Sequence, residues 1–330
     1  MNITILGGGG FLGRKIASQL ARTGTLGGQK VTRLTLFDLH EPPPLDAPFP
    51  VTRLAGDIVA LPEAAIPPGS DVIFHLAAVV SAQAEADYEL GRRVNLRGTD
   101  AVVDACRRLV DNAGKPPRVV FTSSVASFSG GQSANLADDA RQLPANSYGA
   151  QKAAAELILA DASRRGFMDT VSLRLPTVIV RPGRPNKAAS SFFSAIIREP
   201  LLGLPTELPV PDGFAAWVCS PRTATAWLLH AGALDTSPLG LSRGINPPGI
   251  SVTIARLLAG LEEVKPGAAS LVRRVPDPAI EAIVGSWPAR FTPERAPALG
   301  FARHESVVEL IRAFVADDLE ATRRDRGIAI

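Results

Sequence analysis

The opening of the chain sets the tightest limit on what it can fold into. Residues Ile3–Leu6 form a short apolar run typical of a strand, and Gly7, Gly10 and Gly13 follow at once. From residue 10 to residue 22 the apolar side chains recur at helical spacing. A strand that passes through glycines directly into a helix predicts the start of a β–α–β unit, because two parallel strands need such a crossover.

The same alternation continues through the first half of the chain. The further predicted strands are Val31–Asp38, Val51–Leu54, Val72–Leu76, Val119–Phe121 and Val171–Leu175. The helical patterns between them include Leu90–Val110 and Ser147–Arg165. Strands that alternate with helices predict an α/β protein with a Rossmann fold, in which a doubly wound parallel sheet is covered on both faces.

The chain changes character after Arg181, where prolines become frequent. The elements expected beyond that point are the helices Ser190–Arg198, Thr223–Leu234, Ser251–Leu261 and Ser306–Asp317 and the strand Gly244–Asn246. We expect residues 1–180 to form the Rossmann domain, with its sheet completed by residues 223–246. Residues 181–330 are otherwise expected to form a smaller C-terminal lobe that binds the substrate.

Composition argues against several classes of protein. Of the 330 residues, 46% are hydrophobic and 20% charged, and the net charge is only +3. The cationic residues are scattered rather than gathered in a stripe, so no nucleic-acid partner is expected. No apolar run approaches membrane-spanning length, and the N-terminus lacks the basic segment of a signal peptide. Cys106, Cys219 and the four histidines make no metal-ligand spacing. We expect no metal, buried thiols and a soluble cytoplasmic enzyme.

The glycines predict a dinucleotide-binding loop. Glycine permits the tight turn and lets the backbone approach a pyrophosphate at the helix N-terminus. Asp38 ends the next predicted strand, where its carboxylate can accept hydrogen bonds from both ribose hydroxyls and would repel a 2′-phosphate. NAD is therefore predicted in preference to NADP. The alternative interpretation is an ordinary turn, both for the glycines and for Asp38.

Two further segments follow predicted strands of the same sheet. Asp57 and Ile58 come after the third strand, where they can meet the adenine. Residues 75–78, which read His-Leu-Ala-Ala, end the fourth strand, and their small side chains allow the backbone to approach the dinucleotide. His75 itself is expected to be a packed, hydrogen-bonded histidine rather than a catalyst. Asn95 is expected either to tie two strands together by hydrogen bonds or to lie on the surface.

Tyr148 and Lys152 are the candidates for the chemistry. They are four residues apart and would share one face of a helix. The ammonium and the positive nicotinamide ring both stabilise a phenolate, so the phenol can take the proton of an alcohol as hydride leaves. Lys152 can also hold the nicotinamide ribose, and Ser124 can donate a hydrogen bond to the reacting oxygen. Its neighbour Ser123 has a structural role in this interpretation.

In this order the motifs resemble the extended short-chain dehydrogenase/reductase family, which includes nucleotide-sugar epimerases and dehydratases. The likeness spans residues 1–180 and takes in the glycine loop, residues 75–78, Asn95, the Tyr148-x-x-x-Lys152 pair and residues 174–176, which read Arg-Leu-Pro. The resemblance implies that NAD is bound by Gly7, Gly10, Phe11, Leu12, Asp38, Asp57, Ile58, Ala77, Tyr148, Lys152 and Pro176.

The departures from the family pattern bear on the substrate. Leu6 stands where the family usually has Thr. Residues 213–220 lack the Arg that clamps the substrate diphosphate in nucleotide-sugar epimerases, and bidentate donors of that kind are hard to replace. Residues 181–193, with residues 217–222, are similar to the D-erythronate dehydrogenase branch. Members of that branch oxidise the C2 hydroxyl of a four-carbon sugar acid to the 2-oxo acid.

We therefore expect NAD-dependent oxidation of a small sugar acid, D-erythronate to 2-oxo-D-erythronate. The candidate substrate-binding residues are Ser124, Tyr148, Asn186, Lys187, Ser190 and Arg222. For Lys187 and Arg222 the alternative is an ordinary surface charge. Two other functions stay open: a nucleotide-sugar epimerase or dehydratase, and a non-catalytic NAD-binding regulator, although such regulators tend to lose the Tyr/Lys pair. The resemblance also implies a homodimer, because family members often pair through two helices.

Overall fold

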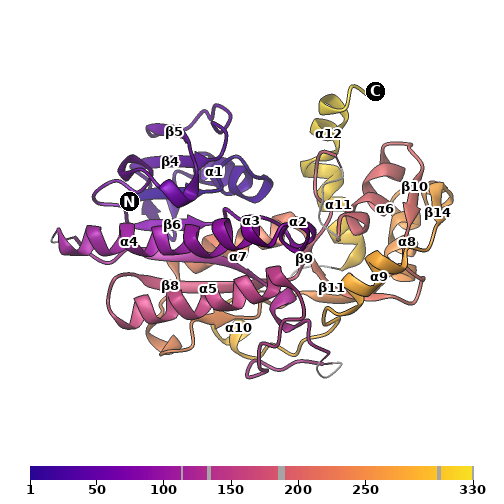
Figure 1. The fold of residues 1–330 in the computed structure, drawn as a ribbon. Coiled ribbons are helices and arrows are strands. Elements are labelled where there is room, and N and C mark those ends of the chain that lie inside the picture. The colour runs from indigo at the N-terminus through magenta and orange to yellow at the C-terminus, as the bar shows by residue number, and fades with distance from the viewer. Residues whose placement is uncertain (113, 132–134, 185–189, 303–305, 329–330) are drawn as a thin grey trace. The chain divides into compact units, whose positions relative to one another are not determined.

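A computed structural model describes the chain apart from residues 113, 132–134, 185–189, 303–305 and 329–330 (Figure 1). Asn186 and Lys187, two of the candidate substrate-binding residues, lie outside the described part. The chain forms two compact units, each made of three segments. The first comprises residues 1–127, 146–174 and 225–246, and the second comprises residues 128–145, 175–224 and 247–330.

A parallel sheet forms the centre of the first unit, as the alternating sequence pattern predicts (Figure 1). Across the described residues the sheet has seven strands. In spatial order they are β12 (Gly244–Ile245), β8 (Asp169–Leu175), β7 (Arg118–Ser124), β6 (Val72–His75), β1 (Asn2–Leu6), β4 (Arg33–Asp38) and β5 (Val51–Ala55). The chain winds outward from β1 in one direction to β5, then returns to β6 on the other side of β1. The carboxyl ends of β1 and β6 thus flank the point where the winding reverses, which is where such sheets bind ligands.

Helices cover both faces of this sheet, as β6 illustrates. Ile73 belongs to a buried cluster with Val102 of α4 (Gly98–Asp111) and Leu159 of α5 (Ser147–Arg164). The next residue, Phe74, points to the opposite face. There it packs so closely against α7 (Pro221–Ala233) that a Cβ added to Gly232 would lie 3.1 Å from the Phe74 ring. A sheet buried on both faces explains why its central strands read as continuous apolar runs.

The helix predicted over Leu90–Val110 is divided. It consists of α3 (Tyr88–Arg92), a π-helical stretch (Arg93–Arg97) and α4. Such wider turns occur as short insertions within α-helices and often lie at functional sites. Here the stretch contains Asn95, which is 3% exposed.

The second unit contains two smaller sheets. One holds β13 (Ile250–Thr253), β11 (Ala215–Cys219) and β9 (Thr177–Val178), and the other holds β10 (Thr206–Leu208) and β14 (Val272–Arg274). The expected helix Ser251–Leu261 was wrong at its start, because residues 250–253 pair antiparallel with β11 and the helix α8 (Ile254–Val264) begins only after them. Thr253 caps that helix by accepting a hydrogen bond from Arg256 N–H.

The α-helices and strands of the described chain that have not yet been named complete the two units. They are α1 (Phe11–Thr23), β2 (Thr25–Leu26), β3 (Gln29–Lys30), α2 (Ser81–Ala86), α6 (Ser191–Leu201), α9 (Pro278–Gly285), α10 (Arg295–Ala298), α11 (Val307–Asp317) and α12 (Leu319–Asp325). Helix α11 begins with a capping box between Ser306 and Glu309, close to its predicted start. Throughout the described residues, no helix combines the length and the apolar character that crossing a bilayer requires.

Candidate functional site

The glycine loop joins β1 to α1 and is shaped to receive a bulky anion. Gly7 has a φ of +92°, and a Cβ added there would lie 2.7 Å from the backbone nitrogen of Ala77. A Cβ added to Gly13 would lie 2.2 Å from the Gly7 carbonyl oxygen. Gly10 is the N-cap of α1 and offers no side-chain cap, so the first N–H groups of the helix have no competing side-chain acceptor there. This loop fits the pyrophosphate of a dinucleotide.

The Asp38 carboxylate closes the loop at the end of β4. Its Oδ2 accepts a hydrogen bond from Gly9 N–H at 2.9 Å, and its Oδ1 accepts one from Leu39 N–H at 2.7 Å. A carboxylate has about four acceptor positions, so these two contacts leave capacity for a pair of ribose hydroxyls. Phe11 and Leu12, at the start of α1, are both partly exposed beside the loop.

Asp57 follows β5 and is held by two donors. It accepts hydrogen bonds from Val59 N–H at 3.0 Å and from the Arg93 guanidinium. The Val59 N–H, followed by Arg93, holds the pKa of the Asp57 carboxyl below its ordinary value. Ile58 is buried in the cluster that also contains Val102. Arg93 belongs to the π-helical stretch, which therefore braces this candidate adenine contact.

Asn95 supports the segment that follows β6. Its Oδ1 accepts a hydrogen bond from Val79 N–H at 2.8 Å, and its Nδ2 donates to the Val79 carbonyl at 3.1 Å. The same Nδ2 donates to Gln151 Oε1 at 2.7 Å. Asn95 thus ties the loop after β6 to α5, so the expectations of a tie between two strands and of a surface position were both wrong. Ala77 is partly exposed and precedes the Val79 anchor.

His75 is packed and hydrogen-bonded, as its sequence context predicts. Its Nε2 lies 3.0 Å from Thr99 Oγ1, and the Thr99 hydroxyl donates to the Asn95 carbonyl at 2.8 Å. Because that hydroxyl has a single hydrogen, it accepts from Nε2–H of the imidazole. Burial, with a smaller contribution from the charge of Lys152, lowers the pKa of His75 to about 3. The His75 imidazole is therefore neutral and has a structural role in this position.

Tyr148 and Lys152 lie one turn apart on α5. The Lys152 Nζ donates to the Thr122 carbonyl at 2.7 Å and lies 5.7 Å from the centre of the Tyr148 ring. It also lies 4.5 Å from the centre of the Phe121 ring. Burial lowers the pKa of Lys152 to about 7, and the charge of Glu156 opposes that effect. Lys152 is thus an ammonium near its titration point beside a partly exposed phenol.

Ser124 ends β7 and remains partly exposed. Its Oγ accepts a hydrogen bond from Ala126 N–H at 3.1 Å. The neighbouring Ser123 is buried and donates to the carboxylate of Glu156, as its expected structural role suggests. Sequence reasoning did not single out Glu156, although its spacing of four residues after Lys152 was a signal for a shared helix face.

The candidates in the second unit form their own contacts. Pro176 is buried. Ser190 is 3% exposed, and its Oγ accepts a hydrogen bond from the Arg181 guanidinium at 3.0 Å. Arg222 makes a two-pronged ion pair with Asp317, at 3.0 Å through Nε and 2.6 Å through Nη2.

Comparison with known proteins adds the family context. The model described as the NAD dependent epimerase/dehydratase family matches residues 3–216. A D-erythronate dehydrogenase from Cupriavidus necator is 47% identical, over 96% of this chain and 98% of its own length. A second D-erythronate dehydrogenase, from Haemophilus influenzae, is 39% identical over 97% of this chain and its whole length.

Solved structures share the fold. A structure described as a nucleoside-diphosphate-sugar epimerase from Agrobacterium tumefaciens is 41% identical, with a TM-score of 0.92, covering 97% of this chain and 95% of that one. An L-threonine dehydrogenase from Cupriavidus necator is 20% identical with a TM-score of 0.82, covering 96% of this chain and 99% of that one, which is a likeness of fold alone.

Proposed function

This chain belongs to the NAD dependent epimerase/dehydratase family and is an NAD-dependent oxidoreductase, and from that premise we propose that it oxidises the C2 hydroxyl of a small sugar acid, D-erythronate to 2-oxo-D-erythronate. The assignment of this substrate rests on the 47% identity to a D-erythronate dehydrogenase over nearly the full length of both chains. Residues 181–330 are proposed to supply most of the substrate-binding lobe.

The proposed chemistry is divided among three side chains of the first unit. Bound NAD supplies the hydride acceptor. Tyr148 takes the proton from the C2 hydroxyl, since the ammonium of Lys152 stabilises the phenolate that this role requires. Lys152 also holds the nicotinamide ribose, and Ser124 donates a hydrogen bond to the reacting oxygen. A proton acceptor placed in this way contributes about 10²–10⁴ to the rate of such a step.

A nucleotide-sugar epimerase is the alternative function. The Agrobacterium tumefaciens structure, described as such an epimerase, favours it at 41% identity. The sequence of residues 213–220 speaks against it, since no Arg stands there to clamp a diphosphate. The two functions differ in whether NADH accumulates, because an epimerase regenerates its oxidised cofactor within each turnover.

A substrate panel tests the proposal. We expect D-erythronate, or a close 2-hydroxy sugar acid, to reduce NAD, which is measured as an increase in the absorbance of NADH. We expect UDP-glucose and UDP-galactose neither to react nor to raise the melting temperature. NADP in place of NAD should give much slower turnover, since the Asp38 carboxylate would face the 2′-phosphate.

Three results would count against these assignments. If a UDP-sugar raises the melting temperature of the protein or is converted by it, and no aldonate is oxidised, the epimerase function is favoured instead. NAD binding without turnover of any panel member would favour the non-catalytic regulator. If the enzyme uses NADP as efficiently as NAD, the assignment of Asp38 as the ribose-binding residue is wrong.

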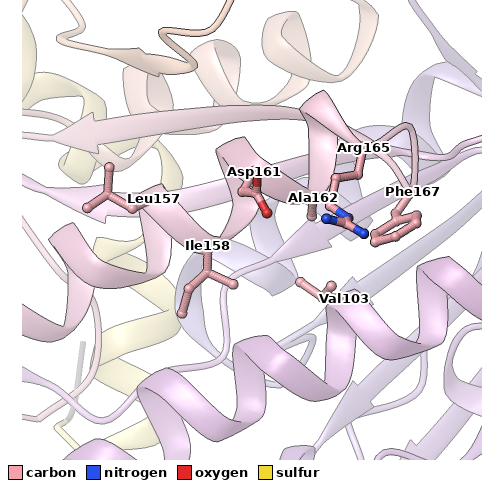
Figure 2. Close-up of a pocket in the computed structure, with 7 residues that line it drawn as sticks. All are labelled: Val103, Leu157, Ile158, Asp161, Ala162, Arg165 and Phe167. Carbon is pink, nitrogen blue, oxygen red and sulfur yellow. The ribbon is translucent and has the colours of Figure 1, made fainter.

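We further propose that the protein is a homodimer that pairs through α4 and α5. A surface pocket of about 400 Å³ lies between these helices (Figure 2). Its lining includes Val103 of α4 and Leu157 and Ile158 of α5. Leu157 is 72% exposed, an unusual state for a large apolar side chain beside other apolar groups. The Arg165 guanidinium stacks 5.5 Å from the centre of the Phe167 ring at the end of the same pocket.

Leu157→Glu is expected to convert the dimer to a monomer. Two copies of the substituted helix would bring like charges into an apolar contact, which disfavours pairing. Sedimentation at micromolar concentration measures the mass, and Leu241→Glu is the matched control because Leu241 is 74% exposed outside this surface. A wild-type monomer, or a dimer that survives Leu157→Glu, would show that α4 and α5 are not the interface.

A cytoplasmic location is part of the proposal. Cys106 and Cys219 are both buried thiols in the structure. Thiols that are not oxidised to disulfides are usual in a reducing compartment.

A further inference from the structure

Glu156 is a buried carboxylate one helical turn beyond Lys152 on α5. Its side chain is 6% exposed. The Ser123 hydroxyl donates to Oε1, and the Arg174 guanidinium donates to Oε2 at 3.0 Å through Nε and pairs with it at 2.9 Å through Nη2. Residues from β7 and β8 therefore hold this carboxylate on the face of α5 that also carries Lys152.

We propose that Glu156, held by Ser123 and Arg174, is a positioning residue that keeps the Lys152 ammonium charged beside Tyr148. The inference rests on the proposed function, because it takes Tyr148 as the proton acceptor and Lys152 as the cation that supports it. Glu156 acts through Lys152 and does not itself contact the substrate.

Lys152 needs such a partner because it is almost wholly buried. Its exposed fraction is 2%. Of its three N–H donors, one goes to the Thr122 carbonyl, while the ring faces of Phe121 and Tyr148 lie within 6 Å. A carbonyl and two rings replace water poorly, so burial favours the neutral amine. A neutral amine would no longer stabilise the phenolate of Tyr148.

The groups that face Lys152 come from several elements. His75 on β6 is neutral over the working pH range, because burial lowers its pKa to about 3. Arg174 on β8 is a cation that pairs with Glu156 at 2.9 Å, so this carboxylate lies between charges of opposite sign to its own. Tyr148 and Glu156 lie on α5 itself. Within the described residues, Glu156 is the anion whose charge raises the affinity of Lys152 for its proton.

The sequence supplies a direct reporter for this arrangement. The chain has two tyrosines, and Tyr88 is 57% exposed on α3. In a Tyr88→Phe background, the ultraviolet absorbance of phenolate therefore follows Tyr148 alone. We expect its phenol to ionise well below the ordinary value of about 10 when Lys152 is charged. This titration needs no turnover.

Glu156→Gln in that background is the test. We expect the Tyr148 phenol to ionise about one pH unit higher than in the parent, since one unit charge near Lys152 is lost. The acidic limb of kcat/KM for D-erythronate should move upward with it, and kcat near neutral pH should fall about tenfold, more than KM changes. Glu63→Gln, the same substitution at an exposed position of the first unit, should shift neither curve.

Each outcome decides a separate point. If Tyr148 ionises low in the parent and Glu156→Gln leaves it unchanged, the role of Glu156 is overturned and the proposed function stands. If Tyr148 ionises near pH 10 in the parent, the proposed Tyr/Lys site is itself wrong. Should Glu156→Gln fail to fold, Glu156→Ala decides. It removes the same charge, so an upward shift supports the proposal and an unchanged titration overturns it.

Discussion

Tyr148→Phe is expected to lower kcat for D-erythronate about a thousandfold while leaving the affinity for NAD close to that of the wild type. The substitution removes the hydroxyl that we propose as the acceptor of the substrate proton and keeps the ring beside Lys152, whose Nζ lies 5.7 Å from the ring centre. Little contact area is lost, so the cofactor should bind and the enzyme should fold normally. Steady-state kinetics and NAD titration measure the two quantities separately.

Tyr88→Phe provides the matched control for this prediction. Tyr88 is the other tyrosine of the chain, is 57% exposed and lies on α3, outside the proposed proton-transfer group. Its replacement should leave kcat unchanged. Activity of Tyr148→Phe within a few-fold of the wild type would exclude Tyr148 as the base.

Gly13→Ala is expected to weaken NAD binding about a hundredfold or more and to lower the free energy of unfolding by about 1–3 kcal/mol. The added Cβ would lie 2.2 Å from the Gly7 carbonyl oxygen and 2.9 Å from the Gly8 Cα. Both atoms belong to the backbone of the loop, so the loop itself must move. That movement disturbs the N–H groups proposed to hold the pyrophosphate.

Gly10→Ala in the same loop is the control. It replaces a glycine by alanine without the close contact that a Cβ at Gly13 would make, so it separates the effect of steric crowding from that of losing a glycine. Its added Cβ would lie 3.3 Å from the Gly7 carbonyl oxygen, and its φ of −69° suits any residue. We expect a clearly smaller loss of NAD affinity than for Gly13→Ala. NADH fluorescence titration and thermal unfolding measure both variants, and a Gly13→Ala protein with wild-type affinity would contradict the assignment of this loop.

The parallel sheet could be predicted because its signals are local. Apolar runs such as residues 72–74 identify strands buried on both faces, and Gly7 and Gly13 mark a turn that tolerates no side chain. The π-helical stretch could not be predicted, because the partners of its buried Asn95 are distant in sequence. Asn95 contacts Val79 and Gln151, and neither partner can be identified from the periodicity of residues 90–110.

The candidate site shows the same division. Tyr148 and Lys152 are visible as a spacing of four, since one helix face suffices to bring them together. The contribution of Glu156 depends on Arg174, which a separate strand supplies, so the arrangement exists only after the sheet has formed. Residues 250–253 show the corresponding limit in the second unit, because pairing with β11 overrides a helical pattern.

The place of β12 in the sheet bears on how the protein is made on the ribosome. Gly244 and Ile245 pair with Ser172 and Leu173 of β8, although all of residues 176–224 are synthesised between these two strands and belong to the other unit. The emerging chain therefore has β8 as an open sheet edge until that intervening segment has left the exit tunnel. Open edges of this kind attract other strands. The nascent protein is thus most exposed to misassociation during the interval in which the middle segment of its second unit is being translated.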